Sequence, residues 1–316
     1  MTKPDPFHEG EKYVQERTSE RDVALRNGVI VGRTIPFRAI PFLAQQRMLA
    51  IGSVDDRSWV WGSLVFGVRG LASSPDGRSV VIDRTRIDDG RDDPVWSHLR
   101  VGAGVGLLAI ELSSRRRLRI NGVVNVLDNR RVEVSVREAY PNCPKYVQRR
   151  YLHENPLTAG PDDPHARASG ASGVALDEVR LRVVEAADTL FVASRHPDRG
   201  LDVSHRGGAP GFVRVVDSRR LRIPDYPGNG MFNTLGNFMV DDHAGLVFPD
   251  FEHGQILQLT GTAAVHFDEE EDPRQPTGGS HRYWEFNIAR WLDRPVMTRL
   301  AWELQDASPH NPIAAG

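Results

Sequence analysis

The sequence has a single cysteine, Cys143, which excludes an internal disulfide framework. It has no C-x-x-C pair and no closely spaced pair of histidines, which argues against a structural zinc site. No stretch approaches the roughly 20 consecutive apolar residues of a membrane span. The first residues are polar and charged, without the apolar run of a signal peptide. These absences predict a cytoplasmic protein without a membrane partner.

Net charge is also small. The 316 residues carry a formal charge of −2, so the chain lacks the field that gathers nucleic acid, and no nucleic-acid partner is predicted. Lysine is scarce and arginine greatly outnumbers it. That ratio suits anion recognition but also follows genomic composition. The length suggests about two domains.

An internal repeat is present. Residues 47–82 align without a gap over residues 188–223, and most apolar positions pair with apolar ones. A second block, residues 106–122, aligns over residues 245–261 at nearly the same offset. Identical pairs include Leu49 with Leu190, Ser63 with Ser204, Gly67 with Gly208, Asp76 with Asp217, Gly106 with Gly245 and Gly122 with Gly261. Two collinear blocks predict a duplicated fold.

Each copy consists of short apolar or alternating runs separated by turn signals such as "PDG" at 75–77 and "HPDRG" at 196–200. This spacing predicts a mostly β fold with a barrel or sandwich in each half. Short helices are expected at 41–46, 94–100, 144–152, 176–187 and 231–240. The predicted organisation is a first half at 1–152, a linker rich in Pro, Gly, Ala and Asp at 153–175, and a second half at 176–316.

Four segments carry a resemblance to a known family. They are "REAYPNCPKYVQRR" (137–150), "DVSHRGGAPGFVRV" (202–215), "IPDYPGNGMFNTLGN" (223–237) and "LQLTGTA" (257–263). Together with the tandem β halves, they resemble the pyridoxamine 5′-phosphate oxidase-like superfamily of FMN-binding split barrels, in its tandem flavin-nucleotide-binding branch. The resemblance covers roughly residues 7 to 305.

The resemblance implies two split β-barrels that form a pseudo-dimer with FMN in a cleft between them. Single-barrel members are similar in being homodimers with flavin between subunits, so a homodimer of this chain is possible. The halves carry different motifs. "SHRGG" at 204–208 has only "SLVFG" as its counterpart at 63–67, whereas "NCPKYVQRR" follows the last strand of the first half alone. This asymmetry predicts one main site that takes one motif set from each half.

FMN offers a phosphate dianion and a flat ring, so its site needs arginine forks, backbone N–H groups and hydrogen-bond donors. Arg206 beside two glycines, and Lys145 with Arg149 at i,i+4 on an expected helix, suit the phosphate. Arg150 lies off that helix face. Ser204, His205, Gln148 and Asn237 are candidates for the ring edge. The full set of candidates is Lys145, Gln148, Arg149, Arg150, Ser204, His205, Arg206, Gly207, Gly208, Asp225, Asn229, Asn233 and Asn237.

Each of these candidates has an ordinary structural alternative. The "QRR" run suits a solvated helix face, Arg206 an ion pair, the asparagines helix capping and Asp225 a turn. Cys143 has no histidine base in its local motif, so we expect it to pack beneath the site rather than to act as a nucleophile.

The resemblance leaves the reaction open. The preferred hypothesis is an FMN-dependent oxidoreductase. NAD(P)H is its expected partner, and no catalytic residue is assigned. A flavin carrier or sensor, or a degenerate barrel that binds haem or a protein, is the alternative.

Overall fold

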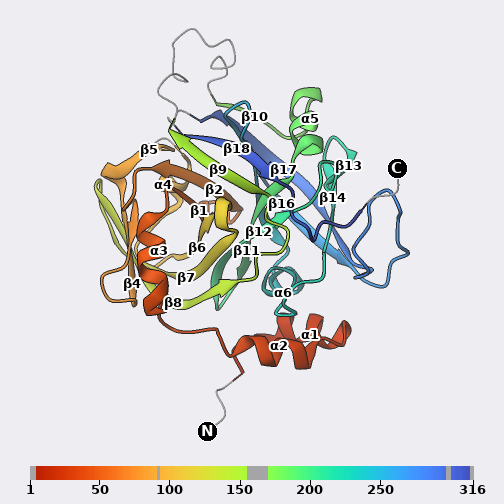
Figure 1. The fold of residues 1–316 in the computed structure, drawn as a ribbon, viewed down its shortest axis with the longest axis horizontal. Helices are drawn as coiled ribbons and strands as arrows, with labels where there is room; N and C mark the ends of the chain where they lie inside the picture. The colour runs from red at the N-terminus through yellow and green to blue at the C-terminus, as the bar shows by residue number, and fades with distance from the viewer. Residues whose placement is uncertain (1–4, 91–92, 155–169, 297–299, 314–316) are drawn as a thin grey trace.

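The computed structural model describes residues 5–90, 93–154, 170–296 and 300–313. The chain is mostly β, and its two large antiparallel sheets lie side by side (Figure 1). In the parts of the chain that are described, every helix is too short or too polar to cross a membrane.

The first sheet contains eight strands. Its order is β3-β4-β8-β7-β6-β1-β2-β5. The strands are β1 (Met48–Val54), β2 (Val60–Gly67), β3 (Ala72–Ser73), β4 (Ser79–Asp83), β5 (Ile87–Asp89), β6 (Gly104–Glu111), β7 (Arg116–Leu127) and β8 (Arg131–Asn142). The longest pairing joins β7 to β8, the hairpin that ends the first half.

The second sheet repeats this order. It runs β13-β14-β17-β16-β15-β11-β12, and the short strand β10 (Ala171–Gly173) pairs with β17. The strands are β11 (Thr189–His196), β12 (Gly200–Gly207), β13 (Arg214–Asp217), β14 (Arg220–Pro224), β15 (His243–Asp250), β16 (Gln255–His266) and β17 (Tyr283–Pro295). Strands β11 to β17 each have a repeat partner in the first sheet, whereas β5 and β10 have none. The tandem mostly-β fold expected from the duplicated sequence is confirmed.

The two sheets meet in a nearly twofold arrangement. A Cβ on Gly106 would fall 2.8–3.0 Å from the backbone of Asp202, and a Cβ on Gly245 would fall 2.5–2.7 Å from the backbone of Trp61 and Gly62. Gly106 and Gly245 are repeat partners, and so are Trp61 and Asp202. The same contact is therefore made twice, as in an interface between identical subunits.

Apolar side chains fill each half and the interface between the halves. Ile51 and Leu107 belong to the core of the first half, and Leu246 and Trp284 to that of the second. A third cluster mixes both halves, with Leu64 and Phe66 packed together with Phe191, Val203 and Val247. Burial of this joint cluster holds the halves together, because apolar area removed from water is the main favourable term in association.

Small helices decorate the sheets, and four of the five expected ones are confirmed. They are α3 (Ile40–Gln45), α4 (Val95–His98), α5 (Glu178–Ala186) and α6 (Asn233–Val240). Two helices were not predicted, α1 (Glu9–Arg17) and α2 (Arg21–Gly28). Single-turn 3-10 helices occupy Phe37–Ala39, Arg84–Arg86 and Leu112–Ser114.

The helix expected at 144–152 is wrong. The chain turns at Lys145 and Tyr146, where Tyr146 has φ 66°, and then enters strand β9 (Arg149–Glu154). Strand β9 pairs with β18 (Leu300–Asp306), the last strand of the chain. The prediction used local spacing alone, and the pairing with a segment some 150 residues away overrides it.

Packing crosses the expected halves at both ends of the chain. Strand β18 follows the second sheet but pairs with β9 of the first half, and helix α1 at the start of the chain packs against α6 of the second half (Figure 1). The expected linker falls mostly on 155–169, which lies outside the described residues. The boundaries of 1–152 and 176–316 remain a prediction.

Candidate functional site

A crevice lies between the two halves. Its cavity volume is about 110 Å³, smaller than the roughly 300–1,000 Å³ typical of small-molecule sites. The first half contributes β7, the end of β8 and the turn that follows. The second half contributes the end of β12 and the segment that leads into α6. The lining residues are Arg117, Arg119, Asn142, Cys143, Lys145, Tyr146, Ser204, His205, Arg206, Gly207, Phe212, Pro224, Asp225, Tyr226, Gly228, Asn229, Gly230, Phe232, Asn233 and Thr234.

Arg117 has no carboxylate partner in the part of the chain that the structure describes. Its guanidinium donates to the carbonyl of Cys143 and, at 3.5 Å, to that of His205. Burial and the neighbouring Arg119 lower the pKa of Arg117 to about 9. Among the described residues no carboxylate lies within 4.0 Å of this guanidinium or of the Lys145 ammonium. The crevice therefore carries positive charge that the protein itself does not neutralise.

Two other arginines of the crevice are held by carboxylates. Arg206 Nη1 lies 2.9 Å from Asp225 Oδ1, and the other oxygen of Asp225 lies 3.2 Å from Arg282 Nε. Arg119 Nη1 lies 3.2 Å from Asp202 Oδ2. The same nitrogen donates to Asn233 Oδ1 at 3.2 Å. These partners fix the orientation of both forks, because a carboxylate accepts an arginine in a defined geometry.

Several side chains that line the crevice have polar atoms without a hydrogen-bond partner among the described residues. Five lining side chains each have a buried polar atom with no hydrogen-bond partner among the described residues: Arg117 Nε, Arg119 Nε, Asn142 Oδ1, His205 Nε2 and Arg206 Nε. Buried polar groups in native proteins are nearly always hydrogen-bonded, and an unmade bond costs ~1–3 kcal/mol. A polar ligand or water in the crevice is the ordinary way to satisfy such a set.

His205 is neutral in this setting. The imidazole is buried, and burial together with Arg117 and Arg206 holds its pKa well below the usual value. The ring edge contacts Phe191, with centroids 5.6 Å apart. His205 therefore adds no charge to the site at physiological pH.

Aromatic side chains form another part of the wall. Tyr146 of the first half and Tyr226 of the second lie with ring centroids 4.9 Å apart. Tyr146 donates its hydroxyl proton to the carbonyl of Pro227 at 2.8 Å, and burial raises its pKa to about 12. Tyr146 and Phe232, with φ 66° and 59°, are both left-handed. Such backbone conformations cost ~1–3 kcal/mol in non-glycine residues and concentrate at ligand sites.

The structure brings most of the sequence candidates together. The crevice is lined by Lys145, Ser204, His205, Arg206, Gly207, Asp225, Asn229 and Asn233. Ser204 Oγ lies 2.9 Å from Thr234 Oγ1, Asn229 Oδ1 accepts from the Met231 amide at 3.1 Å, and Asn233 links Arg119 to the carboxyl group of Glu11. The ion-pair alternative for Arg206 therefore describes a real contact, whereas α6 begins at Asn233 without a side-chain cap and Asp225 lies outside any turn.

Five candidates lie elsewhere: Gln148, Arg149, Arg150, Gly208 and Asn237. Gln148 is buried and bonds the carbonyl of Gly208 at 3.1 Å and the Ser308 amide at 2.7 Å. Arg149 pairs with Asp306 and Arg150 with Asp188. Asn237 joins Ser194 to His8 outside the crevice. Because the segment after Tyr146 is a strand rather than a helix, Lys145 and Arg149 do not share a face.

Gly207 has a packing role within the lining. A Cβ there would fall 2.0 Å from the carbonyl oxygen of Tyr146. The glycine lets the turn of the first half approach the strand of the second half, rather than letting a ligand approach the backbone. Gly208 also has a packing role, because a Cβ there would fall 2.6 Å from the ring of Phe212.

Sequence reasoning missed Arg117 and Arg119. Both lie in "RRRLRING", a run of basic residues in a strand-like segment. Alternation along a strand places Arg117 and Arg119 on one face and Arg116 on the other. The face with Arg117 and Arg119 is the one that meets the second half. The alternation was visible in the sequence, but the face that meets the second half was not.

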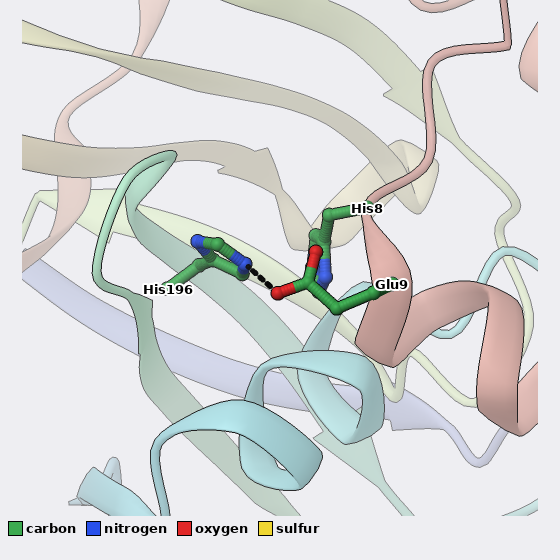
Figure 2. A group of neighbouring side chains, drawn as sticks. All are labelled: His8, Glu9 and His196. Atoms are coloured by element: carbon green, nitrogen blue, oxygen red, sulfur yellow. Dashed lines mark hydrogen bonds and ion pairs between the residues drawn. The ribbon is translucent and has the colours of Figure 1, made fainter.

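A separate cluster joins His8, Glu9 and His196 (Figure 2), whose ligand-type atoms lie within 4.8 Å of one another. His8 Nδ1 accepts from the Gly10 amide at 3.2 Å, and His196 Nδ1 accepts from the Asp198 amide at 3.1 Å. A backbone N–H can only donate, so each ring carries its proton on Nε2, the atom that a metal would need. Metal-binding histidines instead donate from their second nitrogen. These contacts indicate a structural role, in which the cluster anchors the N-terminal segment to β11.

Comparisons with known proteins find similarity of fold only. No protein-family model matches the chain, and no curated protein matches it. Solved structures that match include one provisionally assigned as a pyridoxamine 5′-phosphate oxidase from Lactobacillus delbrueckii, at 17% identity and TM-score 0.31, covering 38% of this chain and 94% of that one. HupZ from Group A Streptococcus matches at 12% identity and TM-score 0.28, over 37% and 92%.

An F420 reductase also matches, at 13% identity and TM-score 0.26, over 34% of this chain and 92% of that one. Each of these three solved proteins thus aligns with less than half of this chain over most of its own length.

Proposed function

We propose that the crevice binds FMN and that the chain is an FMN-dependent oxidoreductase. The observation that carries the proposal is the uncompensated positive charge of Arg117 and Lys145 beside aromatic side chains, in a crevice walled by both halves. A phosphate dianion supplies the missing counter-charge, and arginine forks bind it with charge-assisted hydrogen bonds.

The lining residues suit the parts of FMN. Arg117, Arg206 and Lys145 would hold the phosphate. Tyr146 and Tyr226 would contact the flat ring, and Ser204 and Asn233 offer hydrogen bonds to its polar edge or to the ribityl chain. When bound, the flavin supplies hydride and electron transfer, for which NAD(P)H is the proposed donor.

The chain's own residues position these groups and set the charge of the site. Asp225 orients Arg206, and Asp202 orients Arg119. Neutral His205 leaves the positive charge on the arginines and on Lys145. Since one chain supplies both walls of the crevice, a homodimer is not needed to complete the site.

The test is a visible absorption spectrum of the purified protein, followed by titration of the cofactor-free protein with FMN. We expect a flavin spectrum, or quenching of added FMN fluorescence with a micromolar or tighter Kd, and then bleaching of the bound flavin by NADPH or NADH. Binding without bleaching by either donor would favour a carrier or sensor. A haem spectrum, or a protein that cannot be loaded with FMN, would refute the proposal.

A further inference from the structure

A twofold arrangement of the halves implies a second crevice, related to the first by the repeat. Its residues follow from the alignment. Arg117 and Arg119 correspond to Ile256 and Gln258, and His205 and Arg206 to Leu64 and Val65. The counterpart has therefore lost all three arginines that line the first crevice.

Contacts in the counterpart confirm this correspondence. Ser204 Oγ lies 2.9 Å from Thr234 Oγ1 in the first crevice. Ser63 is the repeat partner of Ser204, and its Oγ donates at 2.6 Å to Oδ1 of Asp93, which lies between the two aligned blocks as Thr234 does. Gln258, the partner of Arg119, donates to Ser63 Oγ at 3.0 Å and to the Gly62 carbonyl at 2.8 Å.

Arg294 extends from the second half into the counterpart crevice. It lies opposite Ile256 in the β16–β17 pairing, as Asn142 lies opposite Arg117 in the β7–β8 pairing, so Arg294 is the counterpart of a lining residue. Its Nη1 lies 2.8 Å from Asp89 Oδ2, its Nε 3.2 Å from Asp93 Oδ2, and its Nη2 donates to the Leu64 carbonyl at 2.6 Å.

The partners of Arg294 match positions that line the first crevice. Leu64 corresponds to His205, and Asp89 and Asp93 fall in the stretch that corresponds to the segment leading into α6. Both aspartates are buried. The guanidinium thus lies where the repeat would place a ligand, and it neutralises two carboxylates of the opposite half.

We propose that Arg294 fills the counterpart crevice, so that each chain has one ligand site and, at the symmetry-related position, an ion-pair bridge between its halves. The count of one ligand per chain rests on the proposed function. The bridge does not, because it follows from contacts within the chain.

The first measurement is the stoichiometry of FMN binding to the full-length chain, for which we expect one equivalent per chain. The second is thermal unfolding of Arg294→Ala without ligand. Removing one partner of a buried ion pair leaves uncompensated charge, and we expect Tm to fall by on the order of 10 °C. Methylguanidinium at low millimolar concentration should restore part of that loss, and sodium chloride at equal ionic strength should not. The matched control is Arg290→Ala, on the same strand and without an ion pair among the described residues.

Should Arg294→Ala fail to fold, Arg294→Lys keeps the charge and loses the fork, and we expect a smaller fall in Tm. Two equivalents of FMN per chain, or an Arg294→Ala protein as stable as Arg290→Ala, would overturn the proposal. If no FMN binds at all, the proposed function fails, while the unfolding and rescue measurements still decide whether the bridge exists.

Discussion

At the scale of single residues, Arg117 is the side chain that most supports the proposed ligand site. A partly buried guanidinium that faces Arg119 and Arg206 instead of a carboxylate destabilises the ligand-free protein. Its pKa, lowered to about 9, records that unfavourable environment. Residues of this kind persist where binding requires them, because stability and function then make opposite demands.

The first prediction concerns Arg117→Met. We expect the affinity for FMN to fall about 10- to 100-fold, the loss of one charge-assisted hydrogen bond of ~1.5–3 kcal/mol. The Tm of the ligand-free protein should stay the same or rise, because an uncompensated charge is removed. Fluorescence titration and thermal unfolding measure the two effects. Arg137→Met, on an exposed position of β8, is the control. A fall in ligand-free Tm well beyond that of the control would contradict this account.

A second residue-scale prediction separates two arginines that sequence reasoning treated alike. Arg206→Ala should weaken FMN binding about tenfold, by ~1.4 kcal/mol, because Arg206 lines the crevice in an orientation set by Asp225. Arg149→Ala should leave the Kd unchanged, because that side chain pairs with Asp306 outside the crevice. Equal losses in the two variants would show that the crevice is not the site.

At the scale of elements, the N-terminal helices hold the segment that walls the crevice. A Cβ on Gly236 of α6 would fall 2.6 Å from Cα of Glu11 in α1, so the two helices touch backbone to backbone. Gln15 donates to the Met231 carbonyl at 3.0 Å, and Asn27 donates to the Asn229 carbonyl at 2.7 Å. Helices α1 and α2 therefore fix the approach to α6, where Asn229 and Asn233 line the site.

The contact between α1 and α6 leads to a pH prediction. Burial raises the pKa of Glu11 to about 8, and burial together with His196 lowers the pKa of His8 to about 4. The stability due to Glu11 is present below pH 4.5 and is lost as pH rises toward 8. The stability due to His8 is present above pH 6.5 and is lost as pH falls toward 4. Between pH 4.5 and 6.5 the two groups change the free energy of unfolding in opposite directions. From pH 6.5 to 8 only the Glu11 effect remains, so the free energy of unfolding falls as pH rises.

Glu11→Gln should remove that loss. Chemical unfolding at pH 6.5 and 8 measures it as the difference in free energy of unfolding, which should shrink by up to about 2 kcal/mol in the variant. Glu16→Gln, in the exposed last turn of α1, serves as the control. An unchanged pH dependence in Glu11→Gln would rule out a buried, proton-holding Glu11.

Elements differ in how well the sequence predicts them. Alternating apolar runs and the collinear repeat predicted the strands of both sheets, because period-two burial is a local signal. Helix α1 was missed because its sequence, "EGEKYVQER", is polar, and it is held by the capping box of His8 and Glu11 and by packing on α6. The segment 144–152 was wrongly predicted as a helix because its partner, β18, lies at the far end of the chain.

At the scale of the whole molecule, the sequence predicted a crevice between the halves but not all the residues that line it. Asymmetry between "SHRGG" and "SLVFG" indicated one crevice with a wall from each half, and the crevice does bring Lys145 and Cys143 beside Arg206. Which face of β7 meets the second half depends on how two sheets pack, and a sequence does not state that. Arg117 and Arg119 were therefore overlooked, while Arg149 and Arg150 were selected for their charge.

The twofold contact at Gly106 and Gly245 gives a prediction for the assembled halves. Alanine at either position would place a Cβ within 3.0 Å of the opposite backbone. We expect each variant to lose roughly 1–3 kcal/mol in free energy of unfolding, measured by urea denaturation. Gly228→Ala is the control, since its Cβ would meet nothing closer than 3.9 Å. Losses at one position only would contradict the twofold arrangement.

The bridge at Arg294 has a consequence for how such a chain evolves. In a dimer of identical subunits, one gene encodes both clefts, so every inherited change that alters one alters the other equally. After two copies are fused into one chain, the two clefts can change independently. Selection can then maintain one cleft for ligand binding while the other gains contacts that stabilise the interface between the halves. Under the proposed function, Asp89 and Asp93 opposite Arg294 are residues that changed in this way.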